Sequence, residues 1–244
     1  MISPITTCSK TVIYMAFVLA NAVFVSGFAA SLPKQSLDQE AAKNIQKIAL
    51  VETHEMQEYI AFSRGSSMFG GLIGGMAAGE ETKAQTTQLT NAFLKDNFSI
   101  AHNISDETAS ALTKIGYQVE RTPDIRELVD GKLHLDYAKV ETQADAILAI
   151  SITISGYMQN RDGSYAPVLA VRAELIGKNR KDRLFQEFYM YQMKRADDWI
   201  YFDIPPEYIF SGIDDLIGRL KKAEEGLDVG STLISDRLAQ DLKK

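Results

Sequence analysis

The sequence predicts an α+β fold in which helices pack on one mainly antiparallel sheet. Two observations support this class. Three β-type stretches joined by short turns predict an antiparallel meander. Amphipathic helical patterns precede and follow that meander, and each needs a surface on which to bury its apolar side. We therefore expect a layered domain rather than a bundle or a barrel.

The first 29 residues have the layout of a secretory signal peptide. Lys10 precedes an apolar run from Val12 to Phe28, and Gly27 and Ala29 supply small residues before a cut after Ala29. The predicted location is the periplasm, in solution or associated with the membrane. The alternative is an uncleaved anchor, because residues 11–30 carry no charge and are long enough to cross a bilayer.

Composition disfavours several classes of function. The 244 residues hold 26 basic and 32 acidic side chains, and removal of residues 1–29 takes away one lysine, which leaves 25 against 32. Nucleic-acid binding needs a basic surface that displaces counterions, so no nucleic-acid partner is predicted. The one cysteine, Cys8, lies in the leader, so the mature chain has no thiol for a disulfide, a nucleophile or a metal site. Cys8 also precedes the apolar run, too early for the lipid-bearing cysteine of a lipoprotein signal.

The elements before the meander are expected in a regular order. Residues 30–44 are polar and predict a tether, and residues 45–51 (IQKIALV) predict a strand. A helix is expected over about 83–102. Ser105 is the expected N-cap of a second helix that Gly116 ends, and YQVERT then reads as a short strand. Residues 123–143 are irregular, with a helical turn or two near 137–142.

The meander is the clearest pattern in the chain. The stretch ADAILAISITISGY passes from a solid apolar run into alternation, with Ile150, Ile152 and Ile154 on one side and Ser151 and Thr153 on the other. Two further strands are expected in YAPVLAVRAELIG and LFQEFYMYQM. The predicted organisation is a core domain over residues 45–204, with a glycine-rich insertion at 66–79, and C-terminal helices over residues 205–244 that pack on it.

Proline and glycine residues predict where the C-terminal helices begin and end. Pro205 and Pro206 suit the first turn of a helix, where the missing N–H group has no partner to lose. Gly226 is expected to end that helix, and an apolar pattern from Leu227 to Leu242 predicts a last one.

The sequence contains no recognisable set of catalytic residues. His54 lies in THEMQE, where Glu58 stands at the place of the second histidine of the zinc-protease motif, and a helical spacing of four would allow only a weak metal site. No Gly-x-Ser-x-Gly elbow occurs. Asp145 is read as a structural carboxylate that accepts backbone N–H bonds at a strand entry. We therefore predict no enzyme, no cofactor and no metal site.

The segment MFGGLIGGMAAG, residues 68–79, is the most unusual local feature. Gly70 and Gly75 have the spacing of a phosphate loop, but Met76 and Ala77 stand where that loop needs lysine and Ser or Thr. Glycines four apart would give a helix a flat strip that another backbone can approach closely. As a helix, residues 66–79 reach about 21 Å, against about 30 Å for the hydrocarbon core of a membrane. The segment cannot span alone.

The segment is therefore predicted to contact a protein partner, a second copy of the chain or a membrane leaflet, with packing in its own fold as the plain alternative. The residues assigned to this contact are Gly70, Gly71, Leu72, Ile73, Gly74, Gly75, Met76 and Gly79.

Several of these stretches together resemble a family. KIALV, GGLIGG, LTKIGYQV and ADAILAISITISGY, with a tyrosine-rich strand beyond them, are similar to a loose group of exported bacterial envelope proteins, many of them lipoproteins. Their α/β core resembles the N-terminal domain of TolB and the periplasmic core of curli-type secretion subunits. The resemblance covers about residues 45–193. It implies non-enzymatic envelope work, such as assembly, transport support or oligomeric scaffolding.

The predicted function is that of an exported, non-catalytic protein that acts through protein–protein contacts or self-association. The alternative is a periplasmic module that binds a small molecule or lipid, with Trp199, Tyr201, Tyr189 and Tyr191 lining a pocket.

Overall fold

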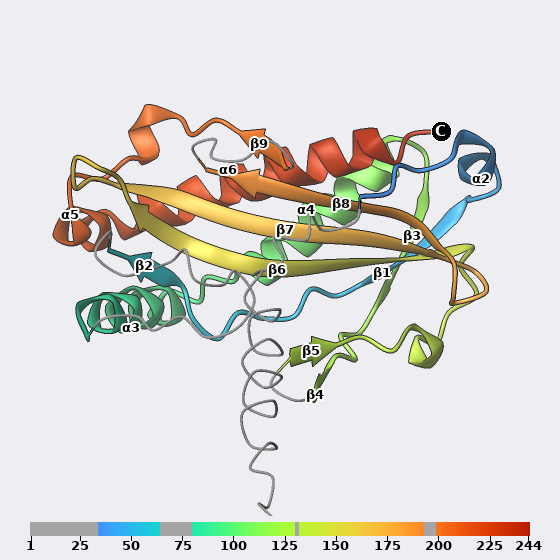
Figure 1. Ribbon diagram of the computed structural model, residues 1–244, viewed down its shortest axis with the longest axis horizontal. Coiled ribbons are helices and arrows are strands. Elements are labelled where there is room, and N and C mark those ends of the chain that lie inside the picture. Colours follow the sequence, from blue (N-terminus) through green and yellow to red (C-terminus); the bar gives the residue numbers. More distant parts are fainter. Residues whose placement is uncertain (1–33, 64–79, 130–131, 193–198) are drawn as a thin grey trace, which may run out of the picture. The chain divides into compact units, whose positions relative to one another are not determined.

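A computed structural model describes residues 34–63, 80–129, 132–192 and 199–244 (Figure 1). Every described residue belongs to one compact unit, residues 34–244. Within this part of the chain, no helix is both long enough and apolar enough to cross a membrane.

Seven of the described strands form one sheet in the order β3-β1-β6-β7-β8-β9, with β2 also paired to β6, and β4 and β5 form a separate two-stranded sheet. The β6–β7–β8 meander is antiparallel, whereas β1 and β2 pair parallel with successive parts of β6, β3 pairs parallel with β1, and β9 pairs parallel with β8. The strands are β1 Lys47–Val51, β2 Ile60–Phe62, β3 Gln118–Thr122, β6 Ala146–Gln159, β7 Tyr165–Gly177, β8 Arg183–Tyr191 and β9 Ile200–Phe202. The predicted meander is confirmed.

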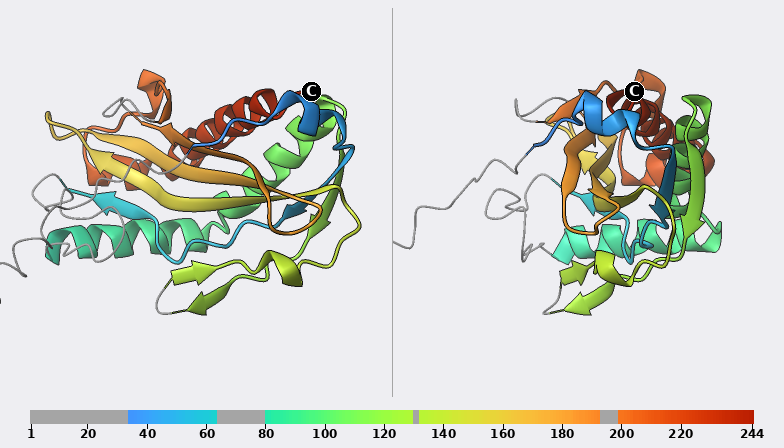
Figure 2. Two further views of the ribbon diagram at one scale, coloured as in Figure 1. Left: turned by 45° about the vertical axis from the view of Figure 1, so that its right-hand side comes forward. Right: turned by 90° about the vertical axis from the view of Figure 1, so that its right-hand side faces the viewer.

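The long helices cover one face of this sheet (Figure 2). Their buried apolar residues share one core cluster with the strands, so the described part of the chain is a helix layer on a sheet layer. The helices are α2 Gln39–Lys43, α3 Glu80–Lys95, α4 Ile100–Lys114, α5 Ile213–Gly218 and α6 Leu220–Asp241, and short 3₁₀ turns occupy Tyr137–Lys139 and Pro206–Tyr208. The predicted α+β class is confirmed.

A bulge in β6 corrects the predicted alternation. The pairing of β6 with β7 shifts between Ile152 and Ile154, which leaves Thr153 as an extra residue. Ile150 and Ile152 therefore face the helices, whereas Ile154 packs on the other side of the sheet with Phe62 and Met158. One inserted residue moves every later side chain to the opposite face.

The two central helices begin and end differently from the prediction. The expected helix over 83–102 stops at Lys95, because Asn97 takes a left-handed conformation and Phe98 N–H bonds back to the Phe93 carbonyl. The next helix starts at Ile100, and the Ser99 hydroxyl accepts its capping bond from His102 N–H. Ser105, the predicted cap, is a buried residue inside α4. The predicted stop at Gly116 is confirmed by its positive φ of 98°.

The C-terminal helices also begin and end at residues other than those predicted. Pro205 and Pro206 open only a 3₁₀ turn, and the stretch predicted as one helix is divided between α5 and α6. Gly226 lies within α6 and does not end it. A Cβ at this position would lie 2.9 Å from the Tyr157 hydroxyl and 3.2 Å from the Tyr208 side chain. Close packing, and not termination, accounts for this glycine.

Two stretches predicted as irregular or as a tether contain regular structure. Residues 123–143 include an antiparallel hairpin of β4, Glu127–Val129, and β5, Lys132–His134. Residues 34–44 include α2, the paired backbone of Gln35 and Gln186, and the buried side chain of Leu37. The proposed domain boundaries themselves stay predictions.

A row of threonines joins α3 to the edge of β2. The Thr90 hydroxyl accepts from Tyr59 N–H at 2.9 Å, and the Thr86 hydroxyl accepts from Ala61 N–H at 3.1 Å. One turn earlier in α3, the hydroxyls of Thr82 and Ser63 lie 2.7 Å apart. Four helical residues advance about 6 Å and two strand residues about 6.6 Å, so the two repeats stay nearly in step. We call Thr82, Thr86 and Thr90 the threonine row.

Candidate functional site

The glycine segment assigned to partner contact lies outside the described residues. Gly70, Gly71, Leu72, Ile73, Gly74, Gly75, Met76 and Gly79 all fall between Ser63, which follows β2, and Glu80, the first residue of α3. The described flanks are held together by the Ser63–Thr82 hydroxyl contact at the start of the threonine row. The assignment of these eight residues stays a proposal.

A polar cluster lies where β1 and β3 end, and Arg126 is at its centre. The guanidinium donates to the carbonyls of Glu52 and Ile150, each at 2.8 Å, and to the Asp124 carboxylate at 2.7 Å. Its side chain is only 3% exposed. Arg126 thus lies where the chain after β1 separates from β6. It donates hydrogen bonds to two carbonyls that have lost their strand partners at that point.

His54 joins the same cluster through Asp124. Its Nδ1 lies 2.6 Å from an Asp124 carboxylate oxygen. Burial would raise the pKa of Asp124, but hydrogen bonds from His54 and from the backbone and guanidinium of Arg126 hold it below its ordinary value. A His–Asp pair can orient an imidazole for proton transfer. Residues 52–59 contain no helix, so the i, i+4 geometry considered for His54 and Glu58 does not form.

A second ring of charges surrounds this pair. Arg121 binds the Glu52 carboxylate through Nε and Nη2, at 2.5 and 2.9 Å, and also pairs with Asp106. Both acidic partners raise the pKa of the Arg121 guanidinium. The buried Ser105 hydroxyl accepts from Thr53 N–H at 3.1 Å. The bonds of Glu52 and Thr53 attach the loop after β1 to β3 and α4, and the Arg121–Asp106 pair joins β3 to α4, so the cluster is accounted for as a structural clasp.

Sequence reasoning missed this clasp because its members come from distant parts of the chain. His54 and Asp124 are 70 positions apart. The available signal was the polar pairs that directly follow two strand patterns, since the carboxyl ends of adjacent parallel strands meet at one edge of a sheet. The structural role predicted for Asp145 is confirmed: its carboxylate accepts from Lys47 and Gln46 N–H at 3.0 Å each, and these bonds lower its pKa.

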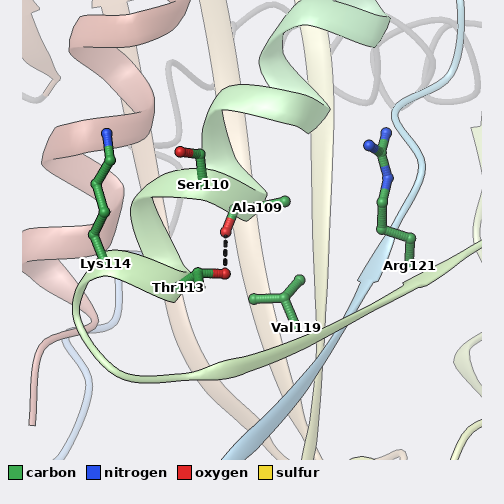
Figure 3. A pocket seen from close by; sticks show the side chains of 6 residues that line it. All are labelled: Ala109, Ser110, Thr113, Lys114, Val119 and Arg121. Atoms are coloured by element: carbon green, nitrogen blue, oxygen red, sulfur yellow. Dashed lines mark hydrogen bonds between the residues drawn. The ribbon is translucent and has the colours of Figure 1, made fainter.

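An open hollow of about 400 Å³ lies between α4 and β3 (Figure 3). Lys114 and Arg121 stand on opposite sides of it, and Val119 lies between them. The Thr113 hydroxyl is bonded to the Ala109 carbonyl at 2.8 Å, and Arg121 is already paired with two carboxylates. In the described part of the chain, no group of three or more His, Cys, Asp or Glu side chains could hold a metal ion.

The sheet face opposite the helices carries an apolar patch at the β2 end, which we call the outer face. Phe62 pairs with Met158, Ile154 pairs with Ala170, and Ala170 pairs with Met190. One cluster on this side, Phe62, Met158 and Val168, contains strand residues only. The outer face comprises Phe62, Ile154, Met158, Val168, Ala170, Phe188 and Met190.

The aromatic residues of the alternative ligand-binding hypothesis do not share one pocket. Tyr189 lies under α6, where its hydroxyl contacts the Asp241 carboxylate at 2.8 Å, and Tyr191 packs against Gly230 of the same helix. Trp199 instead contacts the ring of Phe188, which belongs to the outer face. The sheet therefore separates the tyrosines from the tryptophan.

Comparison with known proteins gives loose structural likenesses alone. No family model matches the chain, and no curated protein matches it. A PelC dodecamer from Paraburkholderia phytofirmans is 14% identical, with 86% of this chain and 95% of the PelC chain covered and a TM-score of 0.40. Protein XCC0632 from Xanthomonas campestris is 8% identical, with 85% and 89% covered and a TM-score of 0.41.

A third structure, the hypothetical protein CT253 from Chlamydia trachomatis, is 10% identical, with 59% of this chain and 71% of CT253 covered and a TM-score of 0.30. At such scores and identities we draw no function from these proteins. The resemblance to TolB-like and curli-secretion-like envelope proteins stays a prediction.

Proposed function

We propose that this chain is an exported, non-catalytic protein of the bacterial envelope that acts through protein–protein contacts, in assembly, transport support or scaffolding. The outer face carries this proposal. It places Phe62, Met158, Val168 and Met190 on a sheet side to which the described helices contribute no residue of the local cluster. A sheet face of this kind needs a covering segment, from the chain itself or from a partner, and such a segment brings a further surface for contacts.

The polar cluster supports the non-catalytic part of the proposal. The Arg126 side chain, 3% exposed, is committed to two backbone carbonyls and Asp124. Asp124 in turn holds His54, and Arg121 is held by Glu52 and Asp106. The bonds of Arg126 and Arg121 go to backbone carbonyls and carboxylates of the fold itself, which supports a structural role for the cluster.

The glycine segment is the proposed association element. Its small residues would let a partner backbone approach closely. The residues assigned are Gly70, Gly71, Leu72, Ile73, Gly74, Gly75, Met76 and Gly79.

Substitution of the glycine strip tests the association. In Gly71→Leu/Gly75→Leu, bulky side chains would hold the partner backbone away, so we expect a smaller mass in solution by light scattering and a loss of co-purifying partners. Gly218→Leu is the control, since nothing lies within 4 Å of a Cβ built at that exposed position. Unchanged mass together with unchanged partner capture would refute the assignment.

A further inference from the structure

The outer face is buried although the described helices pack elsewhere. Val168 is 0% exposed, Phe188 2% and Phe62 5%. The long helices place their apolar residues in the cluster on the opposite side of the sheet. A sheet face without a covering layer would leave such large apolar side chains exposed to water, which is unfavourable. Trp199 covers Phe188, and the β2 end of the outer face, with Phe62, Met158 and Val168, requires a further occupant.

The border of the outer face indicates the chemistry of that occupant. Beyond Ala170 on β7, the same side of the sheet carries charged side chains. Glu174 forms ion pairs with Arg172 and with Arg183, each at 3.3 Å. The apolar part thus spans β2, β6, β7 and β8 and ends at an ion-paired strip. Three interstrand spacings make it about 14 Å wide. A short, uncharged, apolar segment fits these dimensions.

The chain itself supplies such a segment beside the outer face. Phe62 is a member of the face, and the chain leaves the described region one residue later, after Ser63. It re-enters at Glu80, and the Thr82–Ser63 contact holds the two ends together. The 16 residues between them contain one charge, Arg64, and none from Gly65 to Gly79.

The spacing of large residues in this segment gives it two sides. Phe69, Leu72, Ile73 and Met76 recur at i, i+3, i+4 and i+7, the spacing of one helical face. The glycines fall between them, on the other side of such a helix. Eight residues from Phe69 to Met76 would extend about 12 Å as a helix, close to the width of the outer face.

We propose that segment 68–79 docks on the outer face of its own chain through Phe69, Leu72, Ile73 and Met76. Its glycine side then faces outward. This inference rests on the proposed function only in that last respect, because the outward strip would be the surface offered to a partner. Docking on the chain's own sheet does not require that a partner exists.

Cysteine pairing tests the docking. In a Cys8→Ser background, Ile73→Cys combined with Met158→Cys should form a disulfide or a short bismaleimide cross-link within one chain at low protein concentration. Ile73→Cys with Leu233→Cys is the matched control, because Leu233 is a partly exposed residue of α6 on the helix side. We expect efficient cross-linking of the first pair, in monomers, and at least a tenfold lower yield for the second.

Two results of this experiment would overturn the proposal. Equal yields for the two pairs would show that the segment has no preference for the outer face. Cross-linked dimers in place of monomers would assign the outer face to a second copy of the chain. Leu72→Cys with Phe188→Cys repeats the test at another point of the face, and circular dichroism checks that each variant is folded.

Methionine oxidation gives a second, independent measurement. The outer face carries Met158 and Met190, which are 7% and 6% exposed. In Leu72→Ser/Ile73→Ser, loss of the docked side chains should accelerate oxidation of both methionines by dilute peroxide several-fold, as measured by mass spectrometry of peptides. Unaltered oxidation rates would contradict the docking.

The two proposals can fail separately. If Gly71→Leu/Gly75→Leu leaves the mass in solution unchanged while the cross-link forms, the docking stands and the association through the glycine strip falls. If the mass changes while no intrachain cross-link forms, the association stands and the docking falls.

Discussion

At the residue scale, two glycines set how closely α6 can approach the sheet. A Cβ at Gly226 would lie 2.9 Å from the Tyr157 hydroxyl, and one at Gly230 would lie 2.4 Å from the Tyr191 ring. Both tyrosines are fully buried. In these positions glycine is a packing requirement, although it lowers the intrinsic stability of a helix by about 1 kcal/mol.

Substitution of Gly230 should therefore destabilise the fold. In Gly230→Ala the gain in helix propensity is outweighed by the clash with Tyr191, and overpacking of a buried site costs about 1–3 kcal/mol. We expect a lower urea midpoint. Gly218→Ala, at a position with nothing within 4 Å, is the matched control and should be neutral or slightly stabilising. A Gly230→Ala protein as stable as the natural chain would disprove the packing argument.

The charge of Asp124 is the second residue-scale determinant. Its pKa lies below its ordinary value of 3.8, so the ionised form stabilises the folded chain through His54 and Arg126. That contribution is fully present above pH 4–5 and is lost as the pH falls through the folded pKa.

Asp124→Asn should accordingly be less stable at pH 7 by about 2 kcal/mol, the size of a hydrogen bond to a charged group. Because the natural carboxylate becomes protonated in acid, the difference should shrink toward pH 3. Urea unfolding between pH 3 and 7 measures it, with the exposed Asp236→Asn as the control. A difference that is constant over this range would contradict the role of the charge.

At the element scale, the threonine row attaches a very short strand to the rest of the fold. β2 has three residues and pairs with β6 along one edge only. The hydroxyls of Thr86 and Thr90 serve backbone N–H groups along its opposite edge. A helix can complete a strand edge in this way because buried N–H groups need an acceptor.

Thr86→Val removes one such acceptor and keeps the shape of the side chain. The Ala61 N–H would stay buried without its partner, and we expect a loss of about 1–3 kcal/mol in the free energy of unfolding. Thr87→Val, an exposed neighbour on α3, is the matched control and should change little. The measurement is urea unfolding combined with hydrogen exchange of Ala61, whose amide should exchange faster. Slow exchange in Thr86→Val would argue against the row.

At the scale of the whole molecule, the described fold is a helix layer on one face of a mixed sheet (Figure 2). The two faces of the sheet differ in their neighbours. One carries the large core cluster shared with α3, α4 and α6, and the other carries smaller clusters. The outer face lies outside the shared core, so the functional question concerns a side of the sheet that the described helices do not cover.

The sequence by itself determined the α+β class, the meander, the Gly116 stop and the role of Asp145. These features follow from local periodicity and turn chemistry, which short stretches carry without reference to distant residues. Only the tertiary structure decided the position of Gly226 inside α6, the change of face at Thr153, and the meeting of His54, Asp124 and Arg126. In each of these cases the deciding contact joins residues far apart in the chain. The sequence around either partner alone does not indicate a packed tyrosine, a shifted register or a shared strand edge.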